Sequence, residues 1–193
     1  GKSLGDYMTM QTINLDFHGQ ARVWIKDSPS IIYPALDIIT REIKGGLARK
    51  SGIRQAALEL IIPVGPRVCY GLLGVQFIPN DSGKLSVEVR VSTENESIFK
   101  NSMAAQVDTV RIGLPREYSQ SAIDGIVSSL SHQIIETLGS GVIRLEQAAH
   151  GEISSSGKFF RNIAASVMRL LLLDQVSPQE EVTEIVKTCS FSL

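Results

Sequence analysis

Apolar and polar side chains alternate along the first part of the chain. Over residues 13–17 and again over residues 21–25, every second side chain is apolar. A period of two is typical of strands that bury one face. The sequence His18-Gly19-Gln20 between the two runs favours a turn, so the pattern predicts a β-hairpin over residues 13–25.

A different spacing follows. Over residues 31–43, apolar side chains recur every three or four positions, which predicts an amphipathic helix. Ser28 or Ser30 is suited to cap its start, and Pro34 suits a first turn. Gly45-Gly46 would then end the helix.

The middle of the chain is typical of strands. A dense apolar run over residues 57–64 predicts a buried strand, and residues 69–78 predict another. Asn80-Asp81-Ser82-Gly83 is a strong turn signal. Apolar and polar side chains then alternate over residues 85–92, which predicts a half-buried strand. Together these features predict a hairpin over residues 68–92.

The second half predicts a strand over residues 107–112 and then a helix with one apolar face over residues 122–134. Gly139-Ser140-Gly141 ends that helix, and residues 142–145 open a strand. Apolar positions over residues 159–171 predict a second helix, buried on a sheet. The sequence Ser177-Pro178-Gln179-Glu180 is a capping box that starts a C-terminal helix.

A faint internal repeat relates the two halves. Val23-x-Ile25 and Val110-x-Ile112 lie at the same offset as Ala35-Leu36-Asp37 and Ala122-Ile123-Asp124. Each copy would be a strand, a turn with proline and an amphipathic helix, although any two strand–helix units share such periodicity. We therefore expect an α/β (α+β) fold in which diverged copies form one sheet with helices on one face. The expected organisation is an N-terminal strand–helix–strand unit (1–66), a second unit (67–175) and a C-terminal helix (176–193), within one compact domain.

The most specific string in the chain is Val110-Arg-Ile-Gly-Leu-Pro-Arg-Glu-Tyr118, which continues to Ala122-Ile-Asp-Gly-Ile126. It resembles the strand-to-helix junction of elongation factor G domain IV. Further segments that match this family are Cys69-Tyr70-Gly71 through Phe77-Ile78-Pro79, Ile143-Arg144-Leu145, His150-Gly151-Glu152, Ser154-Ser155-Ser156, Phe159-Phe160 and Ala164-Ala165-Ser166-Val167-Met168.

This resemblance covers about residues 68–173 and includes no GTPase domain. It implies the ribosomal protein S5 domain 2-like fold, with a left-handed βαβ arrangement. The string Ile32-Tyr-Pro-Ala-Leu36 also echoes the family, which favours a diverged N-terminal copy.

In that family, tip loops project into the decoding region of the ribosome. The resemblance places one tip loop at Gly139-Ser140-Gly141, which is short and has no basic residue or histidine. It places the other near Pro66-Arg67, which keeps one positive charge.

Composition narrows the possible functions. The 193 residues are 43% hydrophobic and 20% charged, as in ordinary globular proteins. The net charge of −1 excludes nucleic-acid binding by bulk charge, but leaves a local basic patch open. Cys69 and Cys189 are expected to be free, buried or half-buried thiols in a reducing compartment. With no targeting or membrane segment in sight, we expect a cytoplasmic protein that does not contact membranes.

Catalytic signatures are sparse. The chain has no G-x-x-x-x-G-K-[ST] phosphate loop and no G-x-S-x-G elbow. We expect His18, His132 and His150 to be solvated, and His150 with Glu152 is the least implausible acid/base or metal pair. Other side chains expected to face solvent, on helices, are Asp37 and Asp124. No cofactor is predicted.

Basic residues supply the candidate binding site. Arg41, Lys44, Arg49, Lys50 and Arg54 cluster in sequence against a single acid, Glu42. They would either complement the C-terminal end of a helix or hold RNA phosphates. Further candidates are Arg67 and Arg116.

Three functions remain open from the sequence. The first is a non-catalytic binding module that contacts RNA, the ribosome or a protein. The second is a self-associating structural protein, suggested by the apolar C-terminal residues Val182, Ile185, Val186, Cys189 and Phe191. The third is a small-molecule enzyme on an S5-like fold, which would need a pocket lined by His150, Glu152 and Arg116.

Overall fold

One eight-stranded sheet organises the chain. The computed structural model describes residues 10–173 and 179–191, and of Phe191 only the backbone. The strands are β1 (Met10–Asn14), β2 (Gln20–Ile25), β3 (Asp37–Gly45), β4 (Arg54–Val64), β5 (Arg67–Pro79), β6 (Lys84–Val91), β7 (Val110–Ile112) and β8 (Gly141–Gly151). Their order is β1-β2-β4-β5-β8-β6-β3, and β7 pairs with β8. All pairs are antiparallel except β6 and β8, which are parallel.

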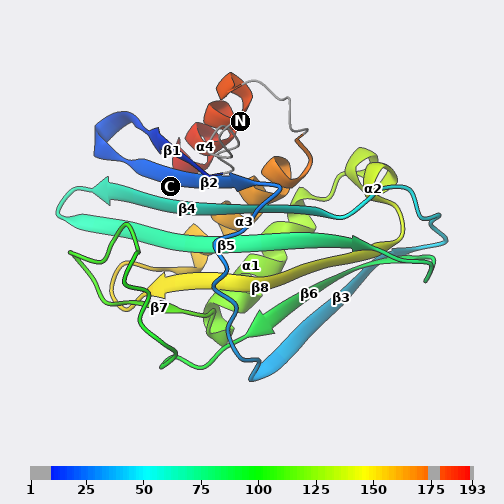
Figure 1. Cartoon of the computed structure of the whole chain (residues 1–193), viewed down its shortest axis with the longest axis horizontal. Helices are drawn as coiled ribbons and strands as arrows, with labels where there is room; N and C mark the ends of the chain where they lie inside the picture. Colours follow the sequence, from blue (N-terminus) through cyan, green and yellow to red (C-terminus); the bar gives the residue numbers. More distant parts are fainter. Residues whose placement is uncertain (1–9, 174–178, 192–193) are drawn as a thin grey trace, which may run out of the picture.

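The helices cover one face of this sheet (Figure 1). They are α1 (Arg116–Ser129), α2 (His132–Leu138), α3 (Gly157–Leu171) and α4 (Gln179–Phe191). Alternate side chains of β4, such as Leu58 and Leu60, point into the main core between sheet and helices. The close fit of α3 requires Gly71 on β5, because a Cβ there would lie 2.8 Å from Ile163 and 2.9 Å from Phe160.

A smaller core lies on the opposite face. It contains Trp24, Ala57, Tyr70, Leu72, Ala104, Val110 and Ala149. The segment 97–109 lies over this core through bonds such as Phe99 N–H to the Val110 carbonyl (2.8 Å). The connection from β2 to β3 crosses the same face (Figure 1), where the amide of Gln147 bonds Ile31 and Ser28.

The connection from β6 to the parallel strand β8 has an unusual hand. Figure 1 views the sheet from the side away from the helices, with β6 and β8 running in the same direction and α1 behind them. The path from β6 through α1 to β8 is therefore left-handed. Such crossovers are right-handed in about 98% of cases, so this feature distinguishes the fold from ordinary α/β proteins.

Several predictions from the sequence are confirmed. The 13–25 hairpin is the β1–β2 pair, with Ile13 opposite Ala21 and a short 3-10 turn (Asp16–His18) between the strands. The buried strand of residues 57–64 is part of β4, and the buried helix of residues 159–171 is α3. Cys69 is half-buried and Cys189 is buried, both as free thiols. The mixed α/β composition, with helices on one face, is as expected.

The helix predicted over residues 31–43 is wrong. Residues 37–45 form strand β3, which pairs antiparallel with β6. Ile39 and Ile43 are four residues apart, a spacing that puts side chains on one side of a strand as well as of a helix. β-branched residues, here Ile38, Ile39, Thr40 and Ile43, favour the strand. Without this helix, the N-terminal unit is not strand–helix–strand, and the internal repeat has no counterpart in the structure.

The hairpin predicted over residues 68–92 is also wrong. The turn at residues 80–83 exists, but β5 and β6 do not pair, because β8 lies between them. Gly141 at the start of β8 is opposite both Pro79 and Leu85. The turn therefore spans two strand spacings instead of one.

Three further boundaries differ. The helix predicted over residues 122–134 is two helices, since Leu130 leaves helical geometry and Ser131 caps α2. The strand predicted from residue 107 begins only at Val110. The C-terminal helix is confirmed as α4, but Ser177 and Pro178 of its predicted cap lie outside the described residues. In the part of the chain that the structure describes, no helix is long and apolar enough to cross a membrane.

Candidate functional site

Five of the seven predicted binding residues are engaged in ion pairs. The sequence offered a helix end as one position for the basic cluster, but its residues lie on β3, in the loop after it and at the start of β4. The pairs are Arg41–Asp124 (2.7 Å), Lys44–Glu136 (3.2 Å), Lys50–Glu136 (3.2 Å), Arg49–Asp81 (3.6 Å) and Arg116–Asp37 (2.8 Å). Most of them connect the edge strand β3, or the loop that follows it, to α1 and α2. The charges of these cations are therefore largely compensated by carboxylates of the same chain.

The electrostatic effect of these pairs is seen on the acids. Lys44 and Lys50 hold the pKa of the Glu136 carboxyl below its ordinary value. Arg116 does the same to the pKa of Asp37, through a hydrogen bond to its carboxylate. Asp37 faces solvent as expected, but it lies on strand β3 and not on a helix. Asp124 lies on helix α1 as expected, and its carboxylate pairs with Arg41.

The last two predicted binding residues lie elsewhere. Arg54 donates to the carbonyl of Leu172 (3.5 Å), whereas Arg67 is exposed in the β4–β5 turn and has no ion pair within the described residues. Residues 139–141 lie at the opposite end of the sheet from Arg67, because β5 and β8 are antiparallel with Pro79 opposite Gly141. The two loops expected to form one tip therefore do not meet.

The loop that shares an end with the β4–β5 turn is the one between β8 and α3. Tyr70 N–H donates to the Ser154 carbonyl (3.0 Å), and the Ser155 hydroxyl donates to the Tyr70 carbonyl (2.6 Å). Asp108 adds bonds to the N–H and hydroxyl groups of Ser154. The loop at 152–156 is thus bound to β5 at Tyr70, three residues after the end of the 64–67 turn.

His150 is not the solvated turn residue expected from the sequence. It is in β8 and only 4% exposed, and its Nδ1 donates to the carbonyl of Gly113 (3.0 Å). Burial lowers the pKa of His150, so the neutral ring is favoured. Its partner Glu152 is bound to Arg111 (3.0 Å). A hollow of about 280 Å³ is lined by His150 and Glu152 but not by Arg116. Among the described residues, no three acidic, histidine or cysteine side chains are placed to hold a metal ion.

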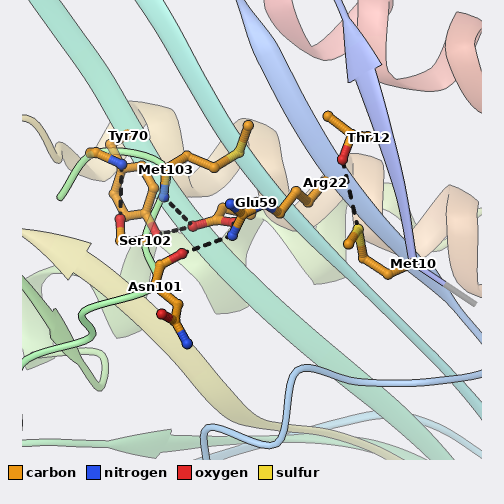
Figure 2. A network of polar contacts seen from close by, with 9 residues as sticks. Met10, Thr12, Arg22, Glu59, Tyr70, Asn101, Ser102 and Met103 are labelled. Atoms are coloured by element: carbon orange, nitrogen blue, oxygen red, sulfur yellow. Dashed lines mark hydrogen bonds and ion pairs between the residues drawn. The ribbon is translucent and has the colours of Figure 1, made fainter. Parts of the chain in front are cut away.

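The most unusual polar group is Glu59, which is fully buried in the middle of β4 on the face away from the helices. Figure 2 shows its carboxylate at the centre of a polar network. The Tyr70 hydroxyl (2.6 Å) and the Met103 N–H (3.1 Å) donate to Oε2. Arg22 donates from Nη1 to Oε1 (3.2 Å) and also to the Asn101 carbonyl (2.8 Å). The network binds the segment 101–103 to the sheet.

Burial shifts the titration of both acids in this network. Desolvation raises the pKa of Glu59, against the opposing effect of its donors and of Arg22. Desolvation together with the nearby Glu59 raises the pKa of Tyr70 well above its ordinary value. The Tyr70 hydroxyl therefore stays protonated and continues to donate its hydrogen bond at neutral pH.

A hollow of about 710 Å³ lies beside this network. Its walls come from β1, β2, the β4–β5 pair and the segment 100–107, and the cations among them are Arg22 and Lys100. No carboxylate belongs to the described residues that line it. The remaining lining residues are Thr12, Gln20, Ile61, Val68, Asn101, Ser102, Met103, Ala105, Gln106 and Val107.

None of the sequence patterns considered above predicted this site, although the sequence contains one signal for it. Glu59 is the single charged residue in the apolar run 57–64, and a charge inside a buried strand needs a partner. Its partners come from β2, β5 and the segment 101–103, which only the folded chain brings together. No protein-family model matches the chain, and neither does any curated protein sequence.

Proposed function

We propose that this chain is a non-catalytic binding module of the ribosomal protein S5 domain 2-like fold, similar to elongation factor G domain IV, and that it contacts the ribosome in the cytoplasm. The observation that carries the proposal is the left-handed β6–α1–β8 crossover. This hand is rare among parallel crossovers, and it is the arrangement that the sequence resemblance implies.

The order of the elements supports the same proposal. From β4 onward the principal elements are three strands, a helix, a strand and a helix, namely β4, β5, β6, α1, β8 and α3. The string Pro115-Arg116-Glu117-Tyr118 starts α1, and Ala164-Ala165-Ser166-Val167-Met168 lies in α3 against the sheet. The first string thus lies at a strand-to-helix junction and the second lies inside a helix, and both positions support the proposal.

The polar groups with shifted pKa values favour binding over catalysis. Glu59 accepts from three donors, and the hydroxyl of Tyr33 donates to the Arg90 carbonyl (2.7 Å). Catalytic groups need an atom that can reach a substrate, and these groups are occupied by structural contacts.

The apolar C-terminal residues no longer support self-association, because they are buried within the chain. Val182, Ile185, Val186 and Cys189 are each at most 3% exposed and belong to the main core, where α4 packs on α3. The side chain of Phe191 lies outside the described residues. These apolar positions serve the fold of one chain.

We assign the contact with ribosomal RNA to the end of the sheet formed by the 64–67 turn and the 152–156 loop. Arg67 is exposed there without an ion pair among the described residues, and Lys100 lines a hollow together with Val68, the residue after Arg67. Unpaired cations attract phosphates more strongly than cations already bound to carboxylates. We therefore expect the ion-paired residues Arg41, Lys44, Arg49, Lys50 and Arg116 to contribute less.

The test is co-sedimentation of the protein with ribosomes over a range of salt concentrations. Arg67→Glu is expected to weaken binding by about ten- to a hundredfold, since a lost charged contact is worth about 1.5–3 kcal/mol. The control Arg169→Glu changes an exposed cation on α3 and is expected to bind like the wild type. If the wild type does not sediment with ribosomes at low salt, or if both variants lose binding equally, the proposal is wrong.

A further inference from the structure

We infer that the hollow beside Glu59 binds the phosphoryl group of a small phosphorylated organic molecule. The inference goes beyond the proposed ribosome contact and does not depend on it. It starts from the charge of the walls, where Arg22 and Lys100 are the cations and no carboxylate lines the hollow within the described residues. Thr12, Gln20, Ser102 and Gln106 add hydroxyl and amide groups that can donate to an anion.

The guanidinium of Arg22 is held in place before any ligand arrives. Its Nη1 donates to the buried carboxylate of Glu59 and to the carbonyl of Asn101. The carboxylate is itself fixed by Tyr70 and by the Met103 N–H, so the whole network is anchored to the sheet (Figure 2). A guanidinium with one edge fixed keeps its other N–H groups for a ligand, and a fixed donor loses little entropy on binding. Arginine is also the side chain best matched to phosphate oxygens.

The charged side chains at the hollow have one positive charge that no carboxylate among the described residues compensates. Glu59 compensates Arg22, which is 31% exposed at its side chain. Lys100 is exposed, and none of the ion pairs among the described residues includes it. An anion in the hollow would therefore be attracted by Lys100 without competition from a carboxylate in the wall.

The size and the apolar wall indicate an organic phosphate of about mononucleotide size. A hollow of about 710 Å³ falls within the usual range of small-molecule sites. Ile61, Val68 and Val107 add apolar surface to the lining, and Val107 is 61% exposed. Such a wall suits the non-phosphate part of a small molecule. An RNA backbone would instead need a groove that follows several phosphates.

The test uses amide NMR spectra of the full chain, titrated with AMP, pyrophosphate and adenosine. We expect saturable shifts at residues 100–107 with AMP and weaker or no binding of adenosine. Lys100→Ala should weaken AMP binding by about tenfold or more, as expected for a charge-assisted contact. The matched control Lys158→Ala removes an exposed lysine at the start of α3 and should bind AMP like the wild type.

Three results would overturn the inference. The first is no saturable shift at residues 100–107 with either AMP or pyrophosphate up to about 10 mM, which is weaker than any useful affinity. The second is an unchanged affinity in Lys100→Ala, with a spectrum that shows an intact fold. The third is a response to a single-stranded RNA oligonucleotide but to neither small phosphate, which would assign the hollow to RNA. The first two results do not depend on whether the protein binds ribosomes.

Discussion

Replacing Glu59 by glutamine tests how much the buried carboxylate contributes to stability. The carboxylate accepts from three donors, two on Oε2 and the third, Arg22, on Oε1. An amide can keep its oxygen toward Tyr70 and Met103, but its NH₂ group then faces the Nη1 of Arg22. The change removes a charge-assisted bond and places two donors face to face.

The magnitude follows from the burial. A hydrogen bond to a charged group is worth about 1.5–3 kcal/mol, and breaking a buried ion pair from one side costs about 3–5 kcal/mol. Arg22 is 31% exposed, so water can solvate it in part after the change. We therefore expect Glu59→Gln to lower the free energy of unfolding by about 2–4 kcal/mol.

The assay is urea unfolding followed by circular dichroism and tryptophan fluorescence, which must coincide for a two-state analysis. Glu88→Gln is the matched control, because Glu88 lies in the same sheet and pairs with Arg144 at 3.2 Å, but is 32% exposed. We expect the control to lose less than about 1 kcal/mol. Equal losses in the two variants would refute the reasoning that burial makes the Glu59 network strong.

Two other predictions concern the packing of the helices and the dependence of stability on pH. Gly125→Ala should destabilise the protein by about 1–3 kcal/mol in the same assay, because the added Cβ would lie 2.3 Å from the Arg161 carbonyl oxygen. Gly45→Ala, where nothing lies within 4 Å, should change stability by less than about 0.5 kcal/mol, and an equal loss at both sites would contradict the close α1–α3 packing. Folding lowers the pKa of His150 below its ordinary value of about 6.5. The neutral histidine therefore contributes fully to stability above about pH 6.5. This contribution is lost as the pH falls further, because the unfolded chain takes up the proton first. We expect His150→Gln to reduce this loss between pH 7 and pH 5, while His132→Gln, at an exposed position, leaves it unchanged; the same pH profile in both variants would show that His150 is not responsible.

The local sequence pattern was enough to predict those elements whose structure is determined by residues close together in the chain. Helix α3 could be predicted because its apolar stripe is long and Ser156 caps it by accepting from Phe159 N–H (3.2 Å). The β1–β2 hairpin could be predicted because both strands and their turn are contiguous. In both elements, the residues that determine the structure are close neighbours along the chain.

Prediction failed where a distant segment decides the structure. Strand β8 separates β5 from β6, and nothing in residues 68–92 signals its insertion. Strand β3 forms by pairing with the edge of β6. The spacing of four between its apolar residues is equally compatible with a helix, so the sequence pattern alone could not decide. The Glu59 network depends on β2, β5 and the segment 101–103, so a sequence pattern shows a buried charge but not its partners.

The predicted binding residues failed for a related reason. Their charges were visible in sequence, but their carboxylate partners were not. Asp124 and Glu136 stand more than 80 residues from Arg41 and Lys44 along the chain, and the fold brings them to 2.7 Å and 3.2 Å. Of the seven candidates, Arg67 keeps an exposed charge without an ion pair among the described residues. A cluster of charges in sequence is therefore a weak guide to a charged surface.

The most direct test of the proposed function is a pull-down of the tagged protein from a lysate of its own cells, with and without RNase, read by mass spectrometry. We predict that ribosomal proteins are recovered with the wild type and disappear after RNase treatment. We also predict a reduced recovery with Arg67→Glu. Recovery of the protein alone, or of one unrelated protein that is insensitive to RNase, would contradict the ribosome contact and would mean that this fold serves another purpose here.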